Sequence, residues 1–152
     1  MKKICREKNG FTLAELLIVV AIIAVLVSIS IPIFTRVLRK SRLAANQANA
    51  RAAYAAAMVW YMENSNTTEQ VNKDAGTFDA STGVFTPGVI STTNPNAPRF
   101  EDANINIDGW TVDTPSRPAY DKRRAGDVVY KKWDIYWSSP FDGTIDAYVA
   151  SE

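Results

Sequence analysis

The pattern of apolar and polar positions is dominated by one long apolar run near the start of the chain. Between Glu15 and Arg36 lie twenty uncharged residues, Leu16 to Thr35, most of them Leu, Ile, Val or Ala. As a helix with a rise of 1.5 Å per residue, this run would span about 30 Å, roughly the hydrocarbon thickness of a bilayer. A fully apolar run of this length favours a membrane-spanning helix over the buried core helix of a soluble protein.

The helical pattern continues beyond the apolar run. Residues 36–62 are rich in alanine and contain no Pro or Gly, which gives them strong helix propensity. Their apolar positions predict a broad stripe facing a sheet or another helix, with Arg39, Arg42 and Arg51 off it. The stripe comprises Val37, Leu38, Leu43, Ala45, Ala48, Ala52, Ala55, Ala56 and Val59. A helix from Phe11 to Met62 would span about 78 Å, so its first half is expected to protrude and its second half to be packed.

The remainder of the chain is polar and reads as β structure. Residues 63–85 and 91–102 are turn-rich and predict connections, and Asp108-Gly109 predicts a two-residue hairpin turn. The alternation in residues 127–139 predicts a strand, and residues 143–150 predict the last one. Three or four antiparallel strands packed on the outer half of the helix would bury the tryptophans. The expected class is therefore α+β, a long N-terminal helix with a small antiparallel head.

Charge divides the chain in the same places. The first ten residues carry four basic residues and one acid, residues 36–62 carry five basic residues and no acid, and residues 63–152 carry eight basic and fourteen acidic residues. Such segregation indicates segments with different environments. We therefore expect a basic stub at 1–10, a transmembrane helix half at 11–35, an amphipathic helix half at 36–62 and a β-rich head at 63–152.

The absent residue types exclude much chemistry. The chain has no histidine, and its one cysteine is Cys5. These absences rule out an intramolecular disulfide, a Cys/His metal site and a Ser–His or Cys–His catalytic pair. No convincing Ser/Lys or carboxylate pair takes their place, so we expect no catalytic residues, no enzyme activity and no cofactor. An enzyme or receptor domain on a membrane anchor remains the alternative of a different class.

Two clusters in the head have possible ligands. A basic cluster beside two aromatic residues is a weak nucleic-acid pattern: Lys122, Arg123, Arg124, Lys131 and Lys132 beside Tyr130 and Trp133. The head is net acidic, so DNA is not expected as a partner. Asp142 and Asp146 flank a Gly in a possible calcium loop, but a hard cation needs six or more oxygens, and two aspartates around a Gly are more typical of a turn. No metal site is therefore predicted.

The start of the chain resembles a signal peptide but differs in one respect. A secretory signal has a shorter apolar region that is followed by a small-residue cleavage site. Here the small residue, Gly10, precedes the run, so a cut at Gly10 would remove the basic stub and leave the helix attached. Basic residues flank both ends of the run, so charge alone does not settle its orientation. A plain, unprocessed anchor is the alternative.

Residues 8–35, KNGFTLAELLIVVAIIAVLVSISIPIFT, closely resemble the N-terminus of type IV pilins and their pseudopilin relatives. The resemblance implies that a prepilin peptidase cuts between Gly10 and Phe11 and that Phe11 becomes N-methylphenylalanine. It further implies that residues 1–10 are a cleaved leader and that the helix half at 11–35 is transmembrane before assembly and forms the filament core after it. The protein would be a single-pass cytoplasmic membrane protein that later enters an extracellular pilus for adhesion or motility. The implied partners are the subunit itself as a homopolymer, the prepilin peptidase, an inner-membrane assembly platform and minor pilins. A pseudopilin of a type II secretion or DNA-uptake apparatus is the alternative within this family.

The resemblance also gives a reason for the lone carboxylate of Glu15. An unpaired charge is costly in a bilayer, but Glu15 is the fifth residue after the expected cut and the cut creates an amine at Phe11. We expect Glu15 of one subunit to pair with the Phe11 amine of a neighbour and so to set the axial register of assembly. The alternative is an interfacial acid that the helix dipole favours. Pro32 is expected to kink the helix, with Ser28 and Ser30 bonding the carbonyls that it frees.

Overall fold

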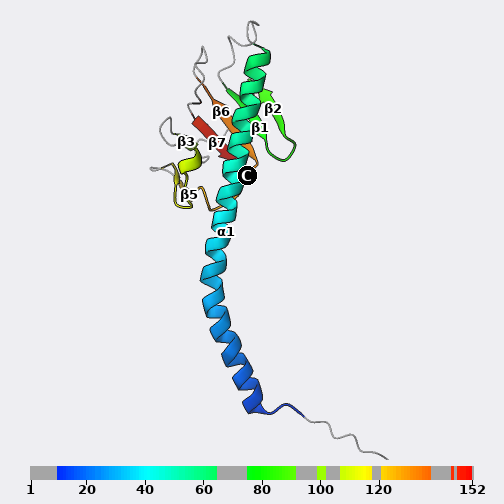
Figure 1. Cartoon of the computed structure of the whole chain (residues 1–152), viewed down its shortest axis with the longest axis vertical. Coiled ribbons are helices and arrows are strands. Elements are labelled where there is room, and N and C mark those ends of the chain that lie inside the picture. Colours follow the sequence, from blue (N-terminus) through cyan, green and yellow to red (C-terminus); the bar gives the residue numbers. More distant parts are fainter. Residues whose placement is uncertain are drawn as a thin grey trace, which may run out of the picture. The chain divides into compact units, whose positions relative to one another are not determined.

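A computed structural model describes residues 10–64, 75–91, 99–101, 107–117, 121–137, 145 and 147–151. The chain falls into two compact units, Met1–Val37 and Leu38–Glu152. The described part of the first unit is the beginning of one helix, and the second unit contains the rest of that helix together with every strand (Figure 1). The α+β class expected from the sequence is confirmed.

The helix α1 covers Leu13–Glu63 without interruption, close to the expected bounds of Phe11 and Met62. Its alanine-rich second half has the residues of highest helix propensity. At its C-terminal end the side-chain amide of Asn64 donates to Trp60 O at 2.8 Å, and the backbone N–H of Asn64 donates to the same oxygen at 3.1 Å. These bonds satisfy one of the carbonyls that a helix end leaves without an intrahelical partner.

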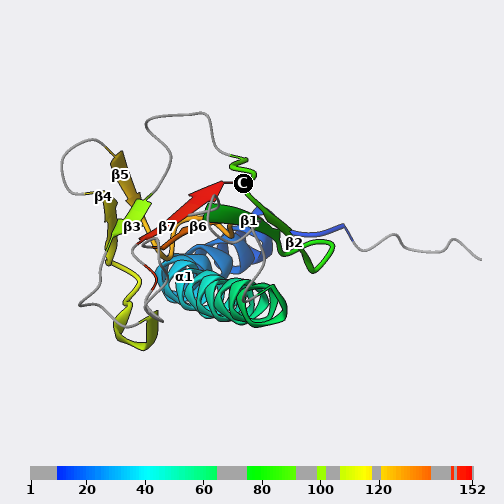
Figure 2. The ribbon, with the colours of Figure 1, turned by 90° about the horizontal axis from the view of Figure 1, so that it is seen from above.

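The strands form two antiparallel sheets. The larger sheet has the order β2-β1-β6-β7-β3, and β4 pairs with β5 in a sheet of two strands. The bounds are β1 Ala75–Asp79, β2 Val84–Pro87, β3 Arg99–Glu101, β4 Pro115–Arg117, β5 Asp121–Arg124, β6 Lys132–Tyr136 and β7 Ala147–Ser151. Figure 2 shows the larger sheet along one side of α1, with β4 and β5 beyond the β3 edge.

The strands expected at 127–139 and 143–150 are present as β6 and β7, each shorter than predicted. Two expectations about connections were wrong. Residues 75–85, expected to belong to a connection, form most of the β1–β2 hairpin, which ends at Pro87 and in which Gly76 lies opposite Pro87 and Asp79 opposite Val84. The expected loop at 91–102 contains β3, which pairs with β7.

The hairpin predicted at Asp108-Gly109 is also wrong. This segment is a short 3-10 helix, η2, Ile107–Gly109. Contacts with α1 hold it in place, because the Gln47 side-chain amide donates to Ile107 O at 2.9 Å and Arg51 forms an ion pair with Asp108. The chain does turn at Asp108-Gly109, but as a helical turn that leads into the buried Trp110 and not as a β-hairpin.

The face of α1 that packs on the sheet is not the predicted stripe. Asn46, Ala50, Ala53 and Ala57 are the buried residues of α1, at the spacing of one helix face. Every member of the predicted stripe is exposed or half-buried. The second half of α1 is apolar on several sides, so apolarity alone did not identify the side that the sheet covers.

Aromatic side chains fill the space between α1 and the sheet. Trp133 is fully buried and stacks on Trp110 with a centroid separation of 6.2 Å, and the ring centroids of Tyr130 and Trp133 lie 5.9 Å apart in an edge-to-face arrangement. A second group joins Trp60 of α1 to Trp137 at 6.3 Å. The alanines of α1 leave room for these rings. The predicted burial is confirmed for Trp110, Trp133 and Trp137, whereas Trp60 is half-buried.

The loop after β5 is bound to α1 through polar side chains. The Asn46 amide donates to Ala125 O and Val128 O, both at 2.8 Å, and its Oδ1 accepts the Tyr130 backbone N–H at 2.9 Å. Both amide hydrogens and the oxygen of this fully buried side chain are therefore used. One turn further along, Asn49 donates to Tyr130 O at 3.0 Å. Side chains of α1 thus form the hydrogen bonds that the backbone groups of this loop would otherwise make to water.

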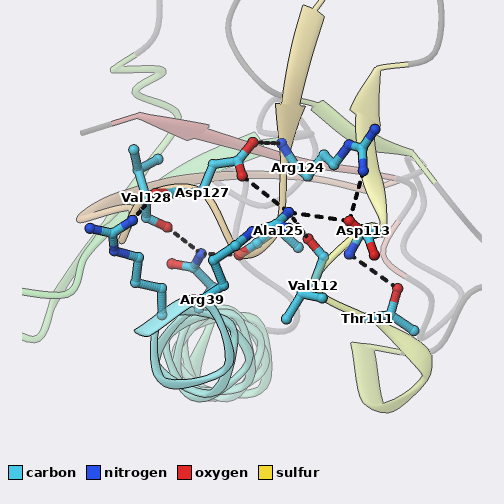
Figure 3. A network of polar contacts seen from close by, with 10 residues as sticks. Arg39, Thr111, Val112, Asp113, Arg124, Ala125, Asp127 and Val128 are labelled. Carbon is cyan, nitrogen blue, oxygen red and sulfur yellow. Dashed lines mark hydrogen bonds and ion pairs between the residues drawn. The ribbon is translucent and has the colours of Figure 1, made fainter. Parts of the chain in front are cut away.

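A network of charged side chains lies beside these hydrogen bonds between α1 and the loop after β5 (Figure 3). Arg39 donates to Val112 O at 3.0 Å, to Asp113 at 3.2 Å and to Asp127 at 3.3 Å. Arg124 donates to Asp113 at 2.7 Å, and the backbone N–H of Arg124 donates to Asp127 Oδ2 at 2.8 Å. Two cations and two carboxylates therefore link α1 to both strands of the β4–β5 pair, at the end where Pro115 lies opposite Arg124.

Replacing Asn46 with alanine should strongly destabilise the head. The change leaves three backbone groups without partners, and at about 1–3 kcal/mol for each unsatisfied group the loss should reach about 3 kcal/mol or more. The matched control is Asn49→Ala, which removes one bond and should cost about 1 kcal/mol. Denaturant unfolding of the full chain in detergent, followed by tryptophan fluorescence, measures both. Equal losses for the two variants would contradict the central role of Asn46.

Acid should loosen the charged network. The hydrogen bond from Arg124, with a smaller contribution from Arg39, holds the pKa of Asp113 below its usual value. Because the folded-state pKa is the lower one, the ionised Asp113 stabilises the fold above its unfolded pKa of about 3.9. That stabilisation is lost as the pH falls through the folded value.

Arg124→Gln should therefore raise the pKa of Asp113 toward its ordinary value. An NMR titration of the Asp113 carboxyl carbon in the detergent-solubilised chain measures this shift. Arg123→Gln removes the neighbouring cation of the same strand and should leave the titration of Asp113 in place. An unchanged titration in the Arg124 variant would show that its bond to Asp113 is not what lowers the pKa.

Candidate functional site

The first unit exposes an apolar surface along its whole described length. Every side chain from Gly10 to Val37 is exposed, and Ala21, Ile22, Val25 and Leu26 line a shallow depression that is wholly apolar. Among the described residues, α1 is the one helix that is long and apolar enough to cross a membrane. So much exposed apolar surface is stable only in a bilayer or against other apolar segments.

The N-terminal end of α1 is closed by a capping box. Glu15 Oε2 accepts the Thr12 backbone N–H at 2.8 Å and the Thr12 hydroxyl at 2.8 Å, and Thr12 Oγ1 accepts the Glu15 N–H at 3.2 Å. Thr12 is thus the N-cap residue and Glu15 the third helical residue. Our sequence reasoning missed the role of Thr12, although the Thr-x-x-Glu spacing before an apolar run is a known signal for this motif.

Gly10 and Phe11 precede α1. The Phe11 side chain is 84% exposed. A Cβ added at Gly10 would meet no atom within 4 Å, and its φ is outside the left-handed region. The fold therefore gives no steric reason for a glycine at this position. The Gly10–Phe11 bond lies in an accessible, non-helical stretch of the kind that a protease requires.

Pro32 lies inside α1, which continues on both sides of it. The expectation about the serines was wrong. Proline removes the hydrogen bond to the carbonyl four residues earlier, that of Ser28. The Ser28 hydroxyl instead donates to Val25 O and that of Ser30 to Leu26 O, both at 2.7 Å. A serine hydroxyl in a helix reaches back to the carbonyl three or four residues before it. The kink at Pro32 remains a prediction.

The basic cluster lacks the accessible aromatics that nucleic-acid stacking needs. Tyr130 and Trp133 are both fully buried. Arg124 bonds to Asp113, and residues 122–124 belong to β5 rather than to a loop. Stacking on bases requires an exposed ring face, so these two residues do not serve that purpose.

The second cluster, Asp142 and Asp146, lies outside the described residues. Within the part of the chain that the structure describes, no group of three or more carboxylate or sulfur ligands gathers at one point. The fully buried carboxylate is that of Asp134 on β6, which accepts the Thr77 hydroxyl at 2.5 Å and the Ser91 N–H at 3.0 Å. These bonds attach the segment after β2 to the sheet, which is a structural role.

Comparison with known proteins gives one match. Residues 5–31 match the family model described as the prokaryotic N-terminal methylation motif. No curated protein and no solved structure matches the chain. The matched segment includes Gly10, Phe11 and Glu15 and all but the last four residues of the apolar run. The chain therefore carries at residues 5–31 the prokaryotic N-terminal methylation motif, the class III leader signature of type IV pilins and of related precursors.

Proposed function

We propose that this chain is a structural pilin subunit that polymerises through its N-terminal helix into a type IV pilus filament. The observation that carries the proposal is the wholly exposed apolar half of α1, whose first turn carries one carboxylate, that of Glu15, within the matched motif. The described residues of the first unit do not cover this surface. Neighbouring helices of the same kind can bury it, and a bilayer can hold it before assembly.

Processing prepares the subunit for assembly. A prepilin peptidase adds water across the Gly10–Phe11 peptide bond, which leaves a carboxylate on Gly10 and an amine on Phe11. Methyl transfer from a sulfonium donor to this nitrogen, with loss of one proton, gives N-methylphenylalanine. The methylated amine remains basic and is cationic near neutral pH. The cut discards Cys5 and keeps the apolar helix.

Assembly then pairs opposite charges from two subunits. Glu15 of one subunit meets the Phe11 amine of a neighbour in a site from which helix packing excludes water. A charge left without its partner in such surroundings is strongly disfavoured. The pair therefore favours one axial register over a slipped one. Pro32 contributes a kink, or a locally extended segment, that adjusts the helix to its neighbours.

The proposed location, partners and role of the subunit follow from these steps. It begins as a single-pass cytoplasmic membrane protein with the stub inside, and it leaves the membrane when it enters an extracellular pilus. Its partners are other copies of itself, the prepilin peptidase, an inner-membrane assembly platform and minor pilins. The role is adhesion or motility through the polymer, and no catalytic residue takes part.

Glu15→Gln should abolish filaments and leave processing intact. The amide keeps the size of the side chain but cannot neutralise the neighbour's amine. Sheared surface filaments, quantified against processed subunit in the membrane fraction, measure the effect. Glu63→Gln is the matched control, since it makes the same change in an exposed residue at the other end of α1. Wild-type amounts of filament from the Glu15 variant would contradict the proposal that Glu15 sets the axial register.

Mass spectrometry of sheared filaments should find methylated Phe11 as the first residue. That one mass reports cleavage at Gly10, methylation and incorporation together. A membrane-retained protein that still begins at Met1 would favour the unprocessed anchor instead. Processed subunit confined to a short periplasmic assembly, with no surface filaments, would favour the pseudopilin role.

A further inference from the structure

Basic residues follow the apolar run of α1 at once. Four of them occupy seven consecutive positions: Arg36, Arg39, Lys40 and Arg42. In a helix, Lys40 comes about 8 Å after the end of the run, and the headgroup layer on each side of the hydrocarbon is about 5–8 Å thick. Helical side chains also tilt toward the N-terminus, which is here the end that enters the bilayer. A bilayer that holds the apolar run therefore has these cations near its phosphates.

The acidic side chains that contact this stretch of α1 are already neutralised. Arg39 pairs with Asp113 and Asp127, and Asp113 also pairs with Arg124 (Figure 3). Among the described side chains, these are the two carboxylates that meet α1 here, and the two guanidinium groups balance their charge. The acidity of the head therefore does not cancel the charge of the other cations.

The other three cations of this stretch have no carboxylate partner among the described side chains. Arg36 and Lys40 are exposed and make no hydrogen bond or ion pair there, and Arg42 donates at 2.6 Å to a backbone carbonyl, which leaves its charge in place. Two apolar side chains of the same stretch are exposed as well, Val37 at 58% and Leu38 at 37%. Exposed cations next to exposed apolar groups suit the boundary between hydrocarbon and lipid phosphate.

We infer that Arg36, Lys40 and Arg42 bind the phosphates of anionic lipid headgroups in the leaflet opposite the stub. The choice of leaflet rests on the proposed function, which keeps the stub in the cytoplasm. These cations then lie on the translocated side, where basic residues are ordinarily scarce. Attraction to anionic lipid offsets that disadvantage, and it holds the start of the head at the membrane surface until the subunit leaves the bilayer.

A lipid surface fits these residues better than other sources of phosphate. A free phosphate ion in water would meet exposed, salt-screened side chains and would cover no apolar group. A bilayer offers many phosphates in one plane, with hydrocarbon directly beneath them for Val37 and Leu38. The three cations then act together, each contributing to binding at an anionic surface.

The test titrates the full chain in micelles of a zwitterionic phosphocholine detergent with short-chain phosphatidylglycerol. The backbone amide NMR signals of residues 36–42 report binding. The wild type should give saturable shifts, with an apparent Kd at least fivefold lower than for phosphatidylcholine of the same chain length. Lys40→Gln should raise the Kd for phosphatidylglycerol about fivefold, the factor for one basic residue at an anionic surface, and Arg36→Gln should do the same. Lys40→Arg should stay within twofold of the wild type.

Lys131→Gln is the matched control because it removes another exposed cation from the head. Lys131 follows Tyr130, whose carbonyl accepts a bond from Asn49, nine residues beyond Lys40 on α1. Nine residues of helix span about 14 Å, which exceeds the Debye length of about 10 Å at 0.1 M salt. The Kd of this variant should therefore stay within twofold of the wild-type value.

Several results would overturn the inference. They are equal affinity for the two lipids, an unchanged Kd in Lys40→Gln, and an equal loss of affinity in Lys131→Gln. Inorganic phosphate that saturated the same shifts at the same concentration would also contradict a lipid site. Loss of sheared filaments from Lys40→Gln with an unchanged Kd would assign this charge to a neighbouring subunit instead. A chain that is never processed would refute the proposed function, whereas the titration needs only the inserted helix and would still decide lipid binding.

Discussion

The head of this protein depends on one buried amide. Asn46 is fully buried on α1, and it supplies both donors and the acceptor for the loop between β5 and β6. Every core strand is attached, directly or through its neighbours, to β6, which begins two residues after Tyr130, the last residue that the amide binds. If the amide is missing, the backbone groups of the loop have no water to replace it. A polar residue in the middle of an apolar helix thereby fixes which face the sheet covers.

This arrangement explains why a small head can be built on half of a long helix. The head brings large aromatic rings, Trp133 from β6 and Trp110 from the segment after η2, and the helix brings alanines that leave space for them. The charged network through Arg39 then attaches the β4–β5 pair, which contributes few apolar side chains to the core. The first unit receives no such cover from its own described residues. The second half of α1 therefore has one face buried by its own chain, whereas the first half needs a bilayer or another molecule to bury its apolar surface.

The sequence predicted those features that depend on local composition. The helix followed from its alanines, and β6 and β7 followed from alternation. The β1–β2 hairpin was missed because Gly76 reads as a turn residue, whereas in the sheet it makes room for a ring: an added Cβ would lie 2.3 Å from an atom of Phe85. That need arises only once the two strands pair. The buried face of α1 was missed for a related reason, since it is set by the polar partners of Asn46 and not by apolarity.

At the candidate site, the features expected from the sequence came from a motif, and the feature that was missed depends on contacts between atoms. The expected cut at Gly10 and the proposed role of Glu15 came from a linear motif, which a sequence displays in full, and the family match covers the same residues. The contribution of Thr12 is a matter of atomic contacts, because its hydroxyl and its amide both point to one carboxylate oxygen. A helix dipole alone would favour an acid anywhere in the first turn. The capping box restricts it to one place, beside the nitrogen that the proposed cleavage would turn into an amine, and the proposed register-setting contact requires such a restriction.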